Sequence, residues 1–570
     1  MKRILYLISI LLLGVFCLGF CACNNNETPV TPTPVTDPNG SDVIGTVAPL
    51  ASPIVYRQDA ESDLSSLTFA WDAVQNAEKY EVLLSVNQNV KYSEDIEDGL
   101  TTFSLDEKYI DELGDYVISV FAKDTDLEYS PSVGTYVLHV TLGSLEKFPI
   151  EISSTDQFFA IDAMPDGFYC LTSDLDFSEV LFNPLCTENN AFAGTLDGNG
   201  YALKNINVTT SKSEMKYDAK VGIFASTYNA TIKNLKIENF SSVSPESYYT
   251  GQEYIGTLAG LCIGGRIENV EVKSSNINWN TYRNLASPVY CVGGLFGLLT
   301  EDAYVADCSV NVNIALSTPF NQNFYMNESG IVTSTDNPYA HFSSMFVGGI
   351  AGSAQITSEL SQNMVIERCS TSGYMAVQGN ILGTGGFLGN VLINTNLSQP
   401  YQTALYDCRS DCSFILSQED DFPSGGDFKK HIGLAVGKAD YLIMKRCFCS
   451  VSVKTKNIDF DDVPTGYIPT VNARALVATY GFVGYGHGES GSAQTSPRPR
   501  IFDDCYYDSE KITENEQYFT KIGSWQKSIY QENVIEISGL NKDEYSLKNS
   551  FDSFDFENVW DITSKGPVLR

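Results

Sequence analysis

The sequence predicts an all-β protein in which a small β-sandwich precedes a long solenoid of stacked strands. Two observations predict this class. A glycine-rich motif recurs seven times between residues 217 and 507, and a short alternating strand follows each copy. Before it, residues 48–145 carry short alternating strands with turn residues every 8–15 positions, as in an antiparallel sandwich. The net charge of −34 repels phosphate backbones, so we expect no nucleic-acid partner.

The N-terminus has the pattern of an export signal. A basic pair precedes an apolar stretch at residues 4–20, which is shorter than the ~20 residues that span a bilayer comfortably. The residues that follow resemble a bacterial lipobox, in which the small Ala22 favours Cys23 as the lipidated cysteine; Cys21 is the alternative. The resemblance implies a lipoprotein signal peptide over residues 1–23, export, and a lipid anchor in the bacterial outer membrane at the cell surface. An ordinary signal peptide is the competing interpretation.

A tether and a small domain follow the signal. Residues 24–47 are rich in proline, threonine and asparagine without apolar periodicity, which predicts an extended spacer. In residues 48–145, Trp71 precedes an alternating strand at Tyr80, and Gly114 precedes a second long alternating run. This segment resembles a fibronectin type III domain, and the resemblance implies that Trp71 packs in the core of the sandwich.

Each repeat combines a glycine-rich motif of up to six residues with a strand that ends in an apolar residue or a cysteine. In the fourth repeat these are residues 347–352 (Val-Gly-Gly-Ile-Ala-Gly) and residues 365–369. Neither segment can bury its apolar face alone, so successive copies must stack, with the glycines where the backbone turns or packs closely. The steps between copies vary from 34 to 55 residues, which predicts loops inserted on a constant core. The first glycines of the seven motifs are Gly222, Gly256, Gly293, Gly348, Gly385, Gly433 and Gly481.

These repeats resemble the GLUG-type repeats of bacterial surface proteins, which build a right-handed parallel β-helix. The resemblance implies such a β-helix over residues 146–507 and a C-terminal cap over residues 508–570. A solenoid needs a cap over its final rung. Phe556, Trp560 and Leu569 would serve as the apolar residues of that cap.

The cysteines predict a ladder of inward-facing thiols. Three of the 14 cysteines lie in or beside the signal, and the odd number that remains excludes complete intrachain pairing. A buried free cysteine behaves as a small hydrophobe; disulfide stapling is the alternative. The chain has no Cys-x-x-Cys pair, and we expect neither a metal nor a cofactor. The cysteines at one equivalent repeat position are Cys308, Cys369, Cys408, Cys447 and Cys505.

Catalytic residues are not apparent, although β-helix folds host polysaccharide lyases and glycoside hydrolases. Glycoside hydrolysis needs two carboxylates ~5–10 Å apart. Asp503 and Asp504 are adjacent on an expected strand and should point to opposite faces, which is a poor geometry for such a pair. The residues 461–462 (Asp-Asp) and 419–421 (Glu-Asp-Asp) fall in polar insertions and are expected to be solvated charges. His341, His431 and His487 lie in separate repeats, and no Gly-x-Ser-x-Gly occurs.

Binding is better motivated by aromatic residues in the insertions. Aromatic faces beside amide side chains suit sugar rings or protein partners; packing of the loops onto the solenoid flank is the alternative. The sequence therefore predicts a non-catalytic, surface-anchored lipoprotein that adheres to or binds a glycan, a host protein or a surface protein. A β-helix carbohydrate-active enzyme and a purely structural spacer are the other hypotheses. The candidate ligand-binding residues are Trp279, Tyr282, Phe320, Phe324 and Tyr325.

Overall fold

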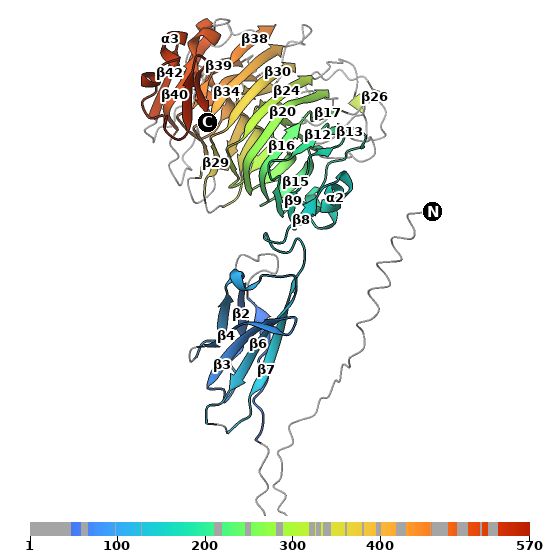
Figure 1. The fold of residues 1–570 in the computed structure, drawn as a ribbon. Helices are drawn as coiled ribbons and strands as arrows, with labels where there is room; N and C mark the ends of the chain where they lie inside the picture. The colour runs from blue at the N-terminus through green and yellow to red at the C-terminus, as the bar shows by residue number, and fades with distance from the viewer. Residues whose placement is uncertain are drawn as a thin grey trace, which may run out of the picture.

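The protein is all-β, as the sequence predicts, with a small N-terminal unit and a large unit of stacked strands (Figure 1). In the described part of the chain, no helix is long and apolar enough to cross a membrane. The signal segment, Cys23 and residues 24–46 of the tether lie outside the described residues. The computed structural model describes residues 47–58, 67–96, 99–126, 128–209, 219–244, 252–280, 289–317, 325–326, 332–333, 344–359, 362–378, 381–394, 401–417, 429–456, 458, 477–486, 500–512, 516–522 and 534–570.

The N-terminal unit consists of two antiparallel sheets around one shared core. The sheets have the strand orders β1-β2-β5 and β4-β3-β6-β7. Trp71 is 1% exposed, and its ring centroid lies 5.4 Å from that of Tyr80, which confirms the prediction that Trp71 is a core residue. The strands are β1 (Val55–Arg57), β2 (Leu67–Trp71), β3 (Lys79–Val86), β4 (Asn89–Ile96), β5 (Thr102–Leu105), β6 (Gly114–Lys123) and β7 (Ser132–Val140).

Each repeat contributes three strand segments, which we call its first, second and third arm. The first arms are β14 (Ala219–Val221), β18 (Glu253–Ile255), β21 (Val289–Gly293), β27 (Ser344–Gly348), β31 (Ile381–Gly385) and the N-terminal parts of β35 (Lys429–Ala439) and β39 (Val477–Gly486). The second arms are β15 (Phe224–Tyr228), β19 (Ala259–Ile263), β22 (Phe296–Thr300), β28 (Ala351–Ile356), β32 (Leu388–Ile393) and the C-terminal parts of β35 and β39. The third arms are β16 (Thr231–Glu238), β17 (Ser241–Val243), β20 (Arg266–Asn280), β23 (Tyr304–Ala306), β24 (Ser309–Ser317), β29 (Met364–Glu367), β30 (Ser370–Gln378), β33 (Thr403–Tyr406), β34 (Arg409–Ser417), β36 (Leu442–Lys445), β37 (Phe448–Cys449), β38 (Ser452–Lys456) and β40 (Ile501–Asp508).

Each arm pairs in parallel with the same arm of the next repeat, which confirms the predicted stacking. Val347 in the first arm of repeat four, for example, pairs with Val292 of repeat three and with Thr384 of repeat five. The first and second arms belong to a 13-stranded sheet, and the third arms belong to a 20-stranded sheet. One apolar cluster runs through the interior from Ile152 to Ile537. The arrangement is β-helix-like, because the described strands of one repeat pair with the equivalent strands of the repeats before and after it in the stack.

The segment before the first repeat begins the stack. Its strands β9 and β11 pair in parallel with each other, and β11 pairs with β16 of repeat one. The short α2 is capped by the side chain of Ser154, which accepts a hydrogen bond from the Gln157 backbone N–H. These elements are β8 (Ile150–Ile152), α2 (Thr155–Phe159), β9 (Phe168–Leu171), β10 (Leu175–Asp176), β11 (Thr195–Asp197), β12 (Ala202–Lys204) and β13 (Asn207–Thr209).

The last glycine of the motif brings the second arm into backbone contact with a first arm. A Cβ atom on Gly352 would lie 2.3 Å from the main-chain nitrogen of Val292 in the preceding repeat. A Cβ on Gly297 would lie 2.3 Å from the nitrogen of Ile255. No side chain fits at these distances, so the prediction that the glycines mark close packing is confirmed. The same approach to a first-arm nitrogen recurs at Gly260, Gly389, Gly437 and Gly484.

The C-terminal region differs from the predicted cap. β41 (Phe519–Ile522) pairs with β39, and β42 (Val534–Leu540) pairs with β40, so both strands extend the stack by a further layer. The cap predicted over residues 508–570 therefore includes two strands that belong to the stack. We call residues 541–570 the C-terminal clamp. This segment contains α3 (Lys542–Tyr545), β43 (Trp560–Thr563) and β44 (Gly566–Leu569).

The C-terminal clamp lies on the flank of the third arms rather than over the final rung. Trp560 is fully buried in a separate apolar cluster that includes Phe448 of β37 and Tyr506 of β40. Arg409 of β34 is buried as well, and its Nη2 donates to the carbonyl oxygen of Lys565 at 2.9 Å. The flank attracts the clamp because Phe448 and Tyr506 lie outside the interior cluster and offer it an apolar surface.

Candidate functional site

In the third arm of every repeat, one residue has a left-handed backbone conformation. It directly precedes the inward-facing position that holds a cysteine in five of the repeats. The φ angles at this position lie between 48° and 56°. The left-handed turn directs this side chain outward and the following one inward, so it forms a corner in the third arm. Asparagine and aspartate tolerate the conformation best, because their short side chains relieve its cost by local hydrogen bonds. This corner ladder consists of Asn234, Asn269, Asp307, Arg368, Asp407, Arg446 and Asp504.

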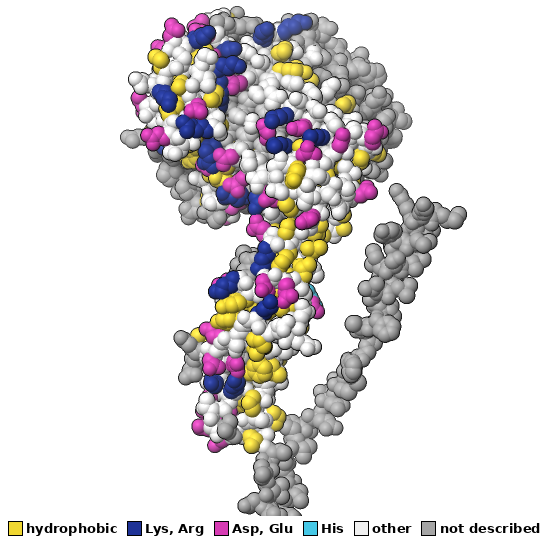
Figure 2. All heavy atoms as spheres, viewed as in Figure 1, with side chains coloured by type: hydrophobic (Ala, Val, Ile, Leu, Met, Phe, Trp, Pro, Cys, Tyr) yellow, Lys and Arg dark blue, Asp and Glu magenta, His cyan; other side chains and the backbone are white. Residues whose placement is uncertain are grey.

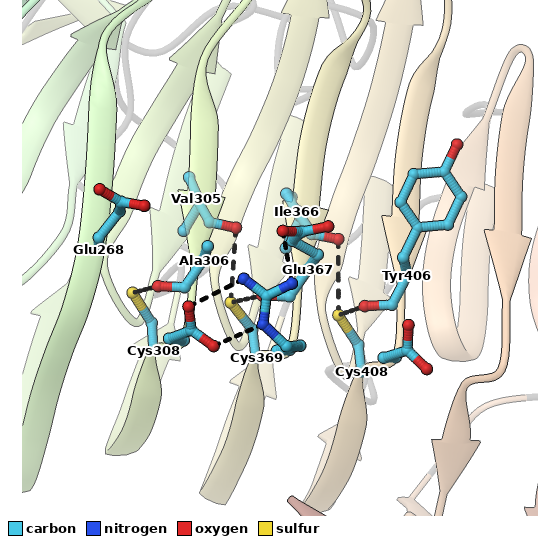
Figure 3. Close-up of polar contacts among 12 residues, drawn as sticks. Glu268, Val305, Ala306, Cys308, Ile366, Glu367, Cys369, Tyr406 and Cys408 are labelled. Carbon is cyan, nitrogen blue, oxygen red and sulfur yellow. Dashed lines mark hydrogen bonds and ion pairs between the residues drawn. The ribbon is translucent and has the colours of Figure 1, made fainter. Parts of the chain in front are cut away.

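Inside the corner ladder lie the five equivalent cysteines, as the sequence predicts. All five are free and at most 2% exposed. Figure 3 shows the sulfur atoms of Cys308, Cys369 and Cys408 in one column, each directed at main-chain carbonyl groups; Cys369 Sγ lies 3.2 Å from the Glu367 oxygen. Burial raises the pKa of the Cys408 thiol well above its usual range. All five thiols are also out of reach of water and of dissolved reagents, so the ladder is a packing feature.

Outside the corner ladder, ion pairs link successive repeats. Arg368 donates to both carboxylate oxygens of Asp307, and Arg446 donates to both oxygens of Asp407 at 2.8 and 2.7 Å. Arg368 also donates to Glu367 at 2.5 Å, and the Tyr304 hydroxyl donates to the same carboxylate. These charged side chains neutralise one another and link neighbouring repeats. They therefore have a structural role.

Two glutamates on this flank lie in register two strands apart, which at ~4.8 Å a strand is close to the ~6.5–9.5 Å between the carboxyl groups of an inverting glycosidase. Figure 3 shows Glu268 and Glu367 on either side of Ala306, with which both are in register. Each carboxylate, however, already binds an arginine: Arg266 lies 2.6 Å from Glu268, and Arg368 lies beside Glu367. Ala306 is buried, so the space between the glutamates is filled. We therefore assign them no catalytic role.

Asp503 and Asp504 do not point to opposite faces, which corrects the expectation from strand alternation. Asp504 has a φ of 50°, and the pairing register shifts between Phe502 and Cys505. A ligand oxygen from each aspartate and one from Glu536 all lie within 4.8 Å of one another. This group could hold a cation, but Asp503 already pairs with Lys445 at 3.1 Å and Asp504 accepts hydrogen bonds from Ser553 and Tyr506.

Trp279 is in the interior, so the prediction that it contacts a ligand at the surface is wrong. The indole is 1% exposed, and its Nε1 donates to the Glu253 carboxylate. The reason is register: Trp279 pairs with Leu316, whose side chain is also buried, and continues the inward positions of β20. The alternation Ile277-Asn278-Trp279 carries this signal in the sequence.

The other candidate ligand-binding residues belong to insertions between repeats. Tyr282, Phe320 and Phe324 lie outside the described residues, and so do residues 419–421 and 461–462. Tyr325 is described by its backbone alone. It belongs to β25 (Tyr325–Met326), which pairs antiparallel with β26 (Val332–Thr333).

The insertions between repeats leave from one edge of the stack. Ser317, where the insertion after repeat three begins, pairs with Gln378, which pairs with Ser417 at the start of the insertion after repeat five. Ser417 in turn pairs with Lys456, where the insertion after repeat six begins. Lys429 and Val477, the first strand residues after the insertions that follow repeats five and six, also pair with each other. We call this corner, between each third arm and the next first arm, the insertion edge.

The surface charge of the repeat unit is mixed. Figure 2 shows lysine and arginine side chains interspersed with aspartate and glutamate on the face turned to the viewer. Lys204 and Lys233, for example, lie within 2.7 Å of carboxylate oxygens from Asp174 and Glu146. The excess negative charge of the chain therefore does not form one acidic patch on this face.

Comparison with known protein families finds no matching family. Among curated proteins, the chain is similar to halomucin from Haloquadratum walsbyi (strain DSM 16790 / HBSQ001), with 31% identity over 167 residues. The match covers 27% of this chain but only 2% of halomucin. The chain thus spans a very small part of that protein's length.

Proposed function

We propose that this chain is an exported, lipid-anchored surface protein that uses the insertion edge for adhesion or for binding a glycan or a surface protein. The insertion edge is the observation that carries the proposal. In a stack of repeats, insertions that leave from the same corner form a continuous row. Such a row is often the binding face of a solenoid protein. Several weak contacts along one row also add up through avidity.

We further propose that the repeat unit is a right-handed parallel β-helix of the GLUG type and that the N-terminal unit is of the fibronectin type III kind. Parallel pairing of equivalent arms supports the first assignment. The three- and four-stranded sheets support the fibronectin type III assignment. Tyr116 supports it as well, because its hydroxyl accepts hydrogen bonds from the backbone N–H groups of Asp111 and Glu112 at 3.0 Å. A tyrosine that ties down the preceding connection recurs in related sandwiches.

The anchor is proposed from the sequence. Lipidation at Cys23 would place the folded units beyond the tether of residues 24–47, at a distance from the membrane that the extended spacer sets. Mass spectrometry of the N-terminal peptide from membrane fractions tests this. A lipid adduct on Cys23 is expected, and cleavage without a lipid would favour an ordinary signal peptide.

A carbohydrate-active enzyme is the second candidate function. Its single supporting observation is the group of Asp503, Asp504 and Glu536. Their oxygen atoms are closer than the ~5–5.5 Å between the carboxyl groups of a retaining glycosidase, and they already bind neighbouring protein groups. Binding without catalysis therefore agrees better with the geometry.

The test of the proposed function is a glycan array together with a panel of matrix proteins, probed with the full mature chain. In one variant, residues 318–343 are replaced by a short Gly/Ser linker. In a matched control, residues 395–400, which connect a second arm to a third arm on another edge, are replaced in the same way. We expect a ligand whose binding is lost in the first variant and kept in the control. Absence of any ligand, or loss in the control alone, would overturn the proposal.

A further inference from the structure

A carboxylate is buried beneath the insertion edge without a basic partner among the described residues. Glu253, the first residue of β18, is 3% exposed. The Trp279 Nε1 donates to it, and in the described part of the chain this is the carboxylate's one hydrogen bond. A buried carboxylate is normally ion-paired or hydrogen-bonded several times, because desolvation of its charge is costly.

The strands that flank Glu253 place no cation beside it within the described ranges. Its neighbours in the same column are Ala219 of β14 and Tyr290 of β21, so the titratable group that flanks it there is the Tyr290 phenol. Lys220 and Cys291 pair with Tyr254, and therefore lie on the opposite face of the sheet.

Two further titratable groups belong to elements that pack nearby. The buried Cys262 lies in β19, and its thiol donates to the Gly264 carbonyl oxygen at 3.5 Å. Lys430 is buried in the same column as Glu253 but four strands away, which at ~4.8 Å a strand is roughly 19 Å. At that distance its charge does little to stabilise the Glu253 carboxylate.

The Glu253–Trp279 hydrogen bond joins two neighbouring insertions at their roots. Residues 245–251 end two residues before Glu253, and residues 281–288 begin two residues after Trp279. The bond thus connects the end of the insertion after repeat one with the start of the insertion after repeat two.

We infer that Glu253 and Trp279 form a pH-sensitive switch that holds the roots of these two insertions together in acid and releases them as the pH rises toward neutral. The inference concerns regulation of the insertion edge, so its biological meaning rests on the proposed function. The local opening that the switch predicts does not rest on the proposed function, because it requires no ligand.

The direction of the pH dependence follows from burial. Desolvation raises the pKa of Glu253 from 4.5 to about 7, and the hydrogen bond from Trp279 opposes the shift. When the roots open, the carboxyl meets water and its pKa returns toward the ordinary value. The closed form is therefore most favoured below pH 4.5, and its advantage falls about tenfold for each pH unit up to about 7, then stays constant. The whole change is about 300-fold in the opening equilibrium.

The test is hydrogen exchange of the full mature chain, measured by mass spectrometry at pH 5 and pH 8 after correction for the intrinsic exchange rates. We expect amides of β18 and β21 to lose protection at pH 8 by roughly two orders of magnitude. Amides of β30, which is remote from Glu253, provide the internal control. Glu253→Gln keeps the side-chain shape and an acceptor oxygen but cannot ionise, so its protection should not change with pH.

The outcomes separate the inference from the proposed function. Equal protection at both pH values in the natural chain, or the same loss in Glu253→Gln, would overturn the switch whatever the binding panel shows. If Glu253→Gln does not fold, Trp279→Phe serves instead: it removes the donor that favours the ionised form, so the loss of protection should continue to a higher pH. An unshifted profile in Trp279→Phe would also overturn the switch.

Discussion

Arg368 of repeat four binds the Asp307 carboxylate of repeat three through two hydrogen bonds, 2.6 Å from Nε to Oδ1 and 2.9 Å from Nη2 to Oδ2. The pair links two rungs at the corner ladder, where Arg368 has a left-handed backbone with φ 48°. An arginine has no local way to relieve that conformation. The two hydrogen bonds to the neighbouring rung therefore explain why the residue is accommodated.

A double-mutant cycle on Arg368→Ala and Asp307→Ala should give a coupling energy of about 0.5–1 kcal/mol, because both side chains are partly exposed. High salt should reduce it. Arg266 and Glu268, a single-contact pair within one strand, provide the comparison and should couple more weakly. Urea unfolding monitored by circular dichroism measures both cycles. A vanishing coupling for Arg368 and Asp307 would contradict the assigned role.

Gly352→Ala should destabilise the stack by about 3 kcal/mol or more, because its Cβ would overlap the backbone of Val292, which cannot move alone. Gly200→Ala is the matched control. Gly200 has φ +79° with open space around it, so the substitution should cost only about 1–2 kcal/mol of backbone strain. Thermal unfolding of the two variants compares them. Equal midpoints would show that the arms do not pack as closely as described.

The five ladder thiols should resist Ellman's reagent in the folded chain and react only after unfolding. Cys170, which is only partly buried, should react first among the cysteines that the structure describes. Peptide mapping of the labelled protein identifies the sites. Cys369→Val should cost less than about 1.5 kcal/mol because it keeps the volume and apolar character of the side chain. Rapid labelling of Cys369 or Cys408 in the native protein would contradict the inward-facing ladder.

Trp560→Ala should release the C-terminal clamp while the repeats stay folded. The indole is fully buried and donates to Asp407 Oδ1 at 3.1 Å, so its removal should cost about 3–5 kcal/mol within the clamp. Limited proteolysis should then cut residues 541–570 much faster, with the remaining stack intact. Leu547→Ala is the control, because Leu547 is 58% exposed and should have no such effect. Co-unfolding of the whole chain would mean that the clamp supports the entire stack.

The features that the sequence predicted are those that recur in every repeat. Gly352 and Cys369 occupy the same position in every repeat that contains them. In a stack of repeats, residues at equivalent positions lie next to one another. Close backbone packing at the glycines and an interior thiol column follow directly from that arrangement.

The features that the sequence did not predict depend on single positions. Asp504 departs from strand alternation because its left-handed conformation breaks the period of two at the corner. The sequence predicts Trp279 in an insertion, but it is the last inward-facing residue of β20. The C-terminal clamp binds the flank because Phe448 and Tyr506 replace the polar residues that earlier third arms present there, and one sequence does not show where a later segment will dock.

The central claim is that the insertion edge binds a ligand without catalysing a reaction. Its most direct test measures ligand binding and product release in the same sample. The full mature chain is incubated with a panel of acidic and neutral polysaccharides, and bound protein is measured beside released reducing ends. The account predicts retention on a ligand, lost when residues 318–343 are replaced, with no product. Release of product, abolished by Asp503→Asn or Asp504→Asn, would contradict it.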